Sequence, residues 1–124
     1  MRHHLRSFKA ELFKALAHPT RIHILELLRS GERTVSDLQA NLSIEASSVS
    51  QQLASLRAKD LVEGRKEGTS VYYRVVDPCV FTLLDAARDI FNNRLVDLQT
   101  MVAEEAALSA REEQEIVLAG DGKR

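Results

Sequence analysis

The sequence predicts a mainly helical fold with one β-hairpin, in the order four helices, two strands and one long helix. Three observations support this fold class. Apolar residues recur every three or four positions in five segments, which is the spacing of amphipathic helices. Two β-prone runs flank a glycine-containing turn between residues 61 and 76, which is typical of a hairpin. Proline, glycine and a capping sequence mark where helices begin and end.

The first two helices are separated by His18-Pro19. Residues 5–17 have helical apolar spacing. Proline disfavours a helical residue before it but suits the first turn of a new helix. A second helix is therefore expected over about 19–29, with His18 as its cap and Gly31 just past its end.

The third and fourth helices are short and lie close together. Thr34 and Asp37 have the spacing of a capping box at the start of the third helix. A brief turn over 41–44 leads into a fourth helix, expected over about 45–59. Its apolar positions, which predict a buried face, are Ala46, Val49, Leu53 and Leu56.

The two strands are expected on either side of Glu67-Gly68-Thr69, and Asp77-Pro78 ends the second one. A last helix is predicted over about 79–108. The expected domain organisation is one domain over 1–108. The charged tail over 109–124 is expected to be disordered.

The last helix is long for so small a domain, because ~30 residues span ~45 Å at 1.5 Å per residue. Its apolar stripe is therefore expected to meet a second chain, together with the first helix. The residues expected at this dimer interface are Leu5, Phe8, Leu12, Leu84, Phe91, Leu95, Leu98 and Val102.

Two helices joined by a short turn and followed by a hairpin form a winged helix-turn-helix, in which the hairpin is the wing. The outer face of the fourth helix is small, polar and nearly uncharged, so it can approach base edges closely. Basic side chains beside it can meet phosphates. The expected DNA-binding residues are Ser47, Ser48, Ser50, Gln51, Gln52, Ser55, Arg57, Arg65 and Lys66.

Charge is divided unevenly along the chain, although the formal net charge is only −1. Residues 1–76 hold twelve Lys/Arg against eight Asp/Glu, whereas residues 77–124 hold five against ten. A basic first part is compatible with a double-stranded DNA partner, and it is equally compatible with an ordinary solvated surface.

Several classes of protein are not expected. No phosphate-binding loop or nucleophile–base pattern points to an enzyme, and no cofactor is expected. No secretory signal or membrane-spanning stretch is recognised, so the cytoplasm is the expected location. The alternative is a winged helix that binds another protein and not DNA. That alternative predicts an apolar or acidic outer face on the fourth helix, which the Ser/Gln face does not match.

The chain resembles the arsenic-repressor (ArsR/SmtB) family of winged-helix regulators over about residues 8–105. The matching stretches are 13–22 (FKALAHPTRI), 49–57 (VSQQLASLR), Leu61-Val62 and 71–75 (VYYRV). The resemblance implies a homodimer through the first and last helices, and a repressor released from its operator by an inducer that the sequence does not identify. It also places Ser48, Ser50, Gln51 and Gln52 on the base-reading stretch, although many relatives have His where Gln52 stands.

The metal ligands of well-known family members are not matched, so no metal site is expected. Thr34 and Ser36 stand where one site has cysteines, and hydroxyls do not hold soft metals. At the second site, Asp77 and Cys79 match in part, but Ile90 and Asn93 replace the remaining ligands. Cys79 has two interpretations: a redox sensor whose thiolate is favoured at a helix N-terminus, or a small packed residue.

Overall fold

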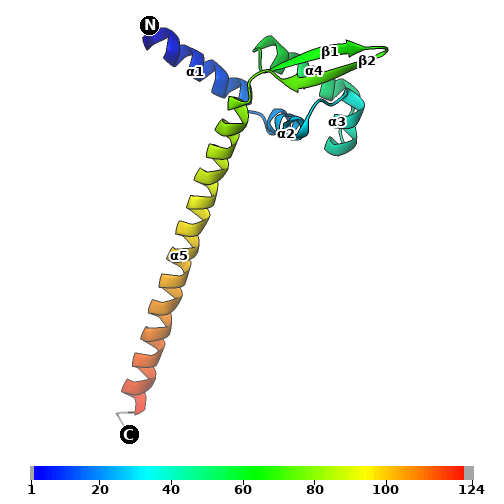
Figure 1. Ribbon diagram of the computed structural model, residues 1–124. Coiled ribbons are helices and arrows are strands. Elements are labelled where there is room, and N and C mark those ends of the chain that lie inside the picture. Colours follow the sequence, from blue (N-terminus) through cyan, green and yellow to red (C-terminus); the bar gives the residue numbers. More distant parts are fainter. Residues whose placement is uncertain (1, 122–124) are drawn as a thin grey trace. The chain divides into compact units, whose positions relative to one another are not determined.

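The structure is a computed structural model that describes residues 2–121, and it has the predicted order of elements (Figure 1). The helices are α1 (Arg2–Leu16), α2 (Pro19–Leu27), α3 (Val35–Leu42), α4 (Ala46–Ala58) and α5 (Cys79–Asp121); a short 3-10 turn, η1 (Leu28–Ser30), follows α2. Strands β1 (Val62–Glu67) and β2 (Ser70–Val75) pair in an antiparallel hairpin. The chain divides after Leu83 into two compact units.

Local signals at the ends of α2 act as predicted. His18 is in extended conformation, and its Nδ1 accepts a hydrogen bond of 3.2 Å from the Thr20 backbone N–H. Pro19 is the first residue of the helix, where its missing N–H costs no hydrogen bond. Gly31 follows η1 with φ 135°, a conformation that side chains disfavour. The break between α1 and α2 is therefore set by the residues at the break itself.

One hydrophobic core holds the first unit together, and its middle is drawn from α2, α3, α4 and β1. Its seven fully buried side chains are Ile24, Leu25, Leu38, Val49, Leu53, Leu56 and Val62. Truncating one such leucine to alanine costs about 2–5 kcal/mol of stability, because a cavity is left behind. The core fixes the inner face of α4, which leaves the opposite face of that helix available to a partner.

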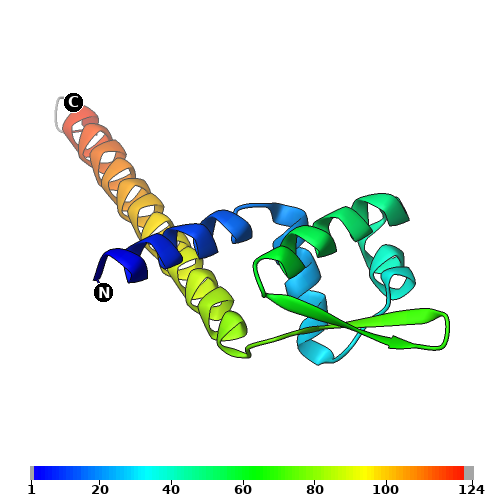
Figure 2. The same cartoon turned by 90° about the horizontal axis from the view of Figure 1, so that it is seen from above.

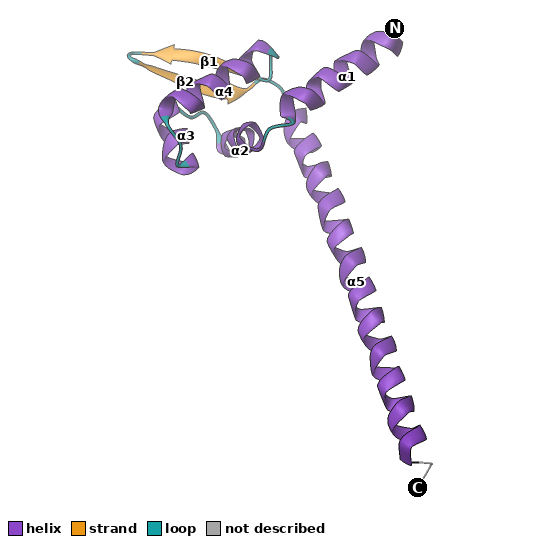
Figure 3. Cartoon of the chain, turned by 180° about the vertical axis from the view of Figure 1, so that it is seen from behind, coloured by secondary structure: helices purple, strands orange, loops and turns teal. Residues whose placement is uncertain are grey.

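Backbone pairing and core packing both attach the hairpin to the helices of the same unit. The Arg33 and Tyr73 backbones exchange hydrogen bonds of 3.1 and 2.8 Å, so Arg33, two residues before α3, extends the sheet by one bridge. Val62, at the start of β1, is buried in the core. The tip of the hairpin reaches beyond α3 and α4 (Figure 3), and the view from above shows the same projection (Figure 2).

The second unit consists of α5 from Leu84 onward. Its residues 86–120 are all exposed, including the apolar side chains of Phe91, Leu95 and Leu98. The helix continues to Asp121, so the prediction that the last helix ends near residue 108 and a disordered tail follows is wrong over 109–121. Residues 109–118 are mostly Ala, Glu, Gln, Arg and Leu, which favour helix, and contain neither Gly nor Pro. The rest of the predicted tail, 122–124, lies outside the described residues.

Within residues 2–121, no helix is both long and apolar enough to cross a membrane.

Candidate nucleic-acid interface

Local backbone features fix both ends of α3. The predicted capping box is confirmed: the Asp37 N–H donates to Thr34 Oγ1 over 3.2 Å, and the Thr34 N–H donates to Asp37 Oδ2 over 3.1 Å. These hydrogen bonds hold the pKa of the Asp37 carboxyl below its ordinary value. Ser43 ends α3 with φ 55°, and α4 begins three residues later. Two short helices thus meet through a tight turn, as in a helix-turn-helix.

Helix α4 presents a small polar surface to solvent. Val49, Leu53 and Leu56 are buried, and the positions opposite them are exposed. Four of the predicted DNA-binding residues lie on this outer face, namely Ser47, Ser50, Gln51 and Arg57. Such a face suits close approach to base edges, because small side chains leave room and the Gln51 amide can both donate and accept.

Three other residues of the predicted set are half-buried: Ser48, Gln52 and Ser55. The Gln52 amide oxygen accepts a 2.8 Å hydrogen bond from Arg21 Nε, and Arg21 also donates to the Ala15 carbonyl over 3.2 Å. Gln52 therefore links α4 to α2 and the end of α1. Ser55 donates its hydroxyl to the Gln51 carbonyl of its own helix over 3.2 Å. The structure thus divides the predicted set into an outer group and an inward-facing group.

The hairpin has a charged face. In the register of the two strands, Arg65 pairs with Tyr72 and Glu63 with Arg74, and Gly68 takes φ 61° in the two-residue turn. Arg74 and Glu63 form an ion pair across the strands. Lys66 is exposed on the opposite face, beside Val71. Within residues 2–121, neither Lys66 nor Arg57 has an ion-pair partner. The ammonium group of Lys66 and the guanidinium group of Arg57 are therefore available to bind phosphates.

Arg65 is held by its neighbours. Its guanidinium contacts Glu32 at 2.8 Å and Glu67 at 2.7 Å, and it lies 5.1 Å from the centre of the Tyr72 ring. The ion pair raises the pKa of Arg65 and lowers that of Glu32. Sequence reasoning selected Arg65 as a phosphate contact but missed Glu32, because that contact joins residues 33 positions apart. A phosphate would have to compete with both carboxylates for this side chain.

A shallow groove of about 380 Å³ lies between the outer face of α4 and the hairpin. Its lining residues are Ser50, Leu53, Ala54, Arg57, Ala58 and Tyr73. Arg57 therefore lies beside both the exposed polar face of α4 and the second strand.

Cys79 is exposed, and its surroundings make its thiol less acidic. Its backbone N–H donates to Asp77 Oδ1 over 2.9 Å, which caps α5. A hydrogen bond to Asp77 and the negative charge of that carboxylate raise the pKa of the Cys79 thiol above its ordinary value. The Asp77 carboxylate thus opposes the preference for the thiolate that is expected at a helix N-terminus, and the redox-sensor role of Cys79 stays a prediction.

Metal ligands do not gather in the described part of the chain. Over residues 2–121, no three His, Cys, Asp or Glu side chains are grouped so that they could hold a metal ion.

Comparison with known proteins identifies relatives. A family model described as the bacterial regulatory protein, arsR family, matches residues 18–64. The chain is 42% identical over 94 residues to an HTH-type transcriptional regulator of Mycobacterium tuberculosis, covering 75% of this chain and 82% of the relative. It is 38% identical over 82 residues to a biofilm growth-associated repressor of Agrobacterium fabrum, covering 66% and 70% of the two chains.

Two solved structures of regulators are also similar to this chain. A homodimeric winged helix-turn-helix DNA-binding domain from Mycobacterium bovis, solved by NMR, superposes with a TM-score of 0.68 and 33% identity, covering 76% of this chain and 87% of that one. The crystal structure of the transcriptional repressor BigR from Xylella fastidiosa gives a TM-score of 0.63 and 30% identity, covering 73% and 96%.

Proposed function

Because this chain belongs to the arsR family of bacterial regulatory proteins, we propose that it is a homodimeric repressor that binds a double-stranded DNA operator and leaves it in response to a signal. The observation that carries this proposal is the exposed Ser/Gln face of α4 beside the hairpin. A helix fits the major groove, and a hairpin next to it reaches the backbone or the minor groove. The proposed place of action is the cytoplasm.

The polar and basic residues of α4 and the hairpin have separate proposed roles. Ser47, Ser50 and Gln51 read base edges or adjacent phosphates, and Arg57 and Lys66 bind phosphates. Gln52 positions α4 through Arg21. Arg65 reaches a phosphate only by leaving Glu32 and Glu67, so its contribution depends on how strongly those carboxylates hold it.

Dimerisation is proposed through two exposed apolar faces. On α1, Leu5 and Phe8 are exposed by 53% and 65%. On α5, Phe91, Leu95, Leu98 and Val102 share one stripe, and all are exposed in the single chain. A second copy that covers these side chains would remove apolar surface from water at a gain of about 25 cal/mol per Å². Half-buried Leu12 and Leu84 border the same faces.

The test is fluorescence anisotropy of labelled DNA from upstream of the protein's own gene, compared with a scrambled duplex of equal length. We expect tighter binding to the upstream DNA, and a loss of affinity with added salt because phosphate contacts release counterions. No binding to either duplex at low salt would contradict the proposal and favour a winged helix that binds another protein.

A further inference from the structure

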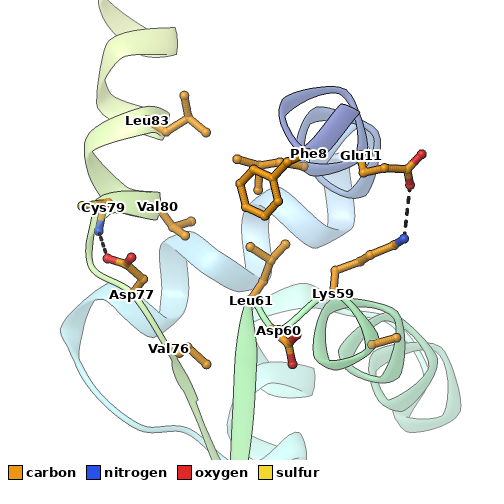
Figure 4. A pocket seen from close by; sticks show the side chains of 12 residues that line it. Phe8, Glu11, Lys59, Asp60, Leu61, Val76, Asp77, Cys79, Val80 and Leu83 are labelled. Atoms are coloured by element: carbon orange, nitrogen blue, oxygen red, sulfur yellow. Dashed lines mark hydrogen bonds and ion pairs between the residues drawn. The ribbon is translucent and has the colours of Figure 1, made fainter. Parts of the chain in front are cut away.

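A pocket of about 570 Å³ opens in the first unit, where α1, the end of α4, the base of the hairpin and the start of α5 meet (Figure 4). Its walls are mostly apolar, formed by Phe8, Leu12, Leu61, Val76, Val80 and Leu83. Two of them, Phe8 and Leu12, also belong to the α1 face proposed for dimerisation, so the pocket borders that face. Figure 4 shows the side chains of Phe8, Val80 and Leu83 directed into one common space. Pockets that bind small molecules have this size and this apolar character.

The polar groups of the pocket carry mainly negative charge. Lys59 is its one cationic lining residue, and its ammonium is 3.2 Å from the Glu11 carboxylate. Two further carboxylates, Asp60 and Asp77, border the same space. With Lys59 paired to Glu11, the remaining charge comes from acidic side chains. The charges around this pocket therefore favour a cation over an organic anion.

The pocket lies where α4, the helix proposed to read DNA, is connected to the hairpin. Residues 58–61 connect α4 to β1 and form one wall. The Leu61 N–H donates to the Leu56 carbonyl over 3.0 Å, and the Val76 N–H donates to the Leu61 carbonyl over 3.1 Å. A molecule wedged against Leu61 thus acts on one hydrogen bond that joins the start of the hairpin to α4 and on another that closes the base of the hairpin.

We propose that this pocket is the effector site, and that its ligand is a small apolar molecule with one cationic amine. The apolar walls bind the body of the ligand, and the Asp60 and Asp77 carboxylates attract its ammonium group. Occupancy shifts the hairpin relative to α4 and weakens DNA binding. This inference rests on the proposed function, because an effector needs a DNA-binding activity to control.

The probe is a matched pair with one apolar body and opposite charge: 1-naphthylmethylamine and 1-naphthylacetate. Isothermal titration calorimetry measures the binding of each to the full chain. We expect saturable binding of the amine and at least tenfold weaker binding of the acetate. Equal affinity for both, or tighter binding of the acetate, overturns the charge assignment.

Two variants locate the site. Asp60→Asn removes a carboxylate while keeping a residue that tolerates the positive φ of 58° at this position. It should weaken amine binding ~5–10-fold. The matched control Asp97→Asn, an exposed carboxylate of α5 outside the pocket, should change nothing. Leu83→Trp should fill the space and abolish amine binding, and an unchanged circular dichroism spectrum and thermal transition show that this variant is folded. Amine binding unchanged in both pocket variants overturns the site.

A second copy of the chain is the rival occupant. Calorimetry of the dimer and of the monomeric Leu95→Glu variant distinguishes the two occupants. If the variant binds the amine and the wild-type dimer shows no heat of amine binding, the partner covers the pocket and the proposal fails.

The regulatory part is tested separately. Saturating amine should lower the affinity for upstream DNA, and by linkage DNA should lower amine affinity by the same factor. Amine binding without any change in DNA affinity overturns the effector role and leaves the repressor proposal intact. Amine binding by a protein that binds no DNA contradicts the proposed function instead.

Discussion

The guanidinium of Arg65 lies 2.8 Å from the Glu32 carboxylate, so an ion pair ties the hairpin to the loop that precedes α3. Glu67 holds the same guanidinium from within β1. Exposed ion pairs of this kind add little to stability. Their consequence concerns DNA, because two carboxylates lie where the wing would approach phosphates.

Releasing Arg65 should strengthen DNA binding. In Glu32→Gln one carboxylate charge is lost and Arg65 becomes available to a phosphate. We expect tighter binding to operator and random DNA alike, with a salt dependence steeper by about one released counterion. Anisotropy titrations at several salt concentrations measure this slope. Glu26→Gln, an exposed carboxylate of α2, is the control. An unchanged slope would show that Arg65 stays away from the phosphates.

Gln51 should read a base. Gln51→Ala is expected to weaken operator binding by ~1–3 kcal/mol and to weaken random DNA binding much less, because a contact between the amide and a base edge is lost only where the matching base is present. The matched control is Gln114→Ala, an exposed glutamine of α5. An equal loss on both DNAs would rule out base reading by Gln51.

Gln52 should contribute to stability. Gln52→Ala leaves the part-buried Arg21 without its 2.8 Å acceptor, which should lower the free energy of unfolding by about 1–3 kcal/mol. Urea denaturation at one fixed protein concentration measures it, since dimer stability depends on concentration. A midpoint equal to that of the original chain would contradict a positioning role.

Leu95 should lie in the dimer interface. Leu95→Glu buries a charge there and should yield a monomer, detected as a halved mass by light scattering. Val96→Glu is the control, because Val96 is also exposed but lies off the stripe formed by Phe91, Leu95 and Leu98. A mass unchanged by Leu95→Glu would exclude this stripe from the interface.

Cys79 should react slowly at neutral pH. The raised pKa means that its thiolate fraction at pH 7 is below that of an unperturbed cysteine, and that reactivity rises only as the pH climbs past the ordinary thiol range. Asp77→Asn should speed alkylation by iodoacetamide at pH 7. The pH dependence of the alkylation rate in both proteins tests this, and faster alkylation of the original chain would reverse the assignment.

Local signals in the sequence predicted the elements well. His18-Pro19, the Thr34–Asp37 capping box and the glycine turn at 68 each act within a few residues, and each is confirmed. The contacts of Arg65 with Glu32 and of Gln52 with Arg21 join residues more than thirty positions apart. Only the fold brings those side chains together, so periodicity and composition did not reveal them.

The end of α5 was mispredicted for a different reason. Charge and the Gly-Asp-Gly ending suggested disorder, but helix propensity over 109–118 outweighs them. At Cys79 the neighbouring Asp77 carboxylate raises the pKa of the thiol, an effect that the helix-terminus argument did not include.

The most direct test of the account is selection of binding sequences from a random duplex pool. A dimer that reads two half-sites with α4 should enrich an inverted repeat, its half-sites spaced by about one helical turn or a multiple of it. The Gln51→Ala variant should lose preference at one position in each half-site. A bound pool with no enriched sequence would contradict sequence-specific recognition by this chain.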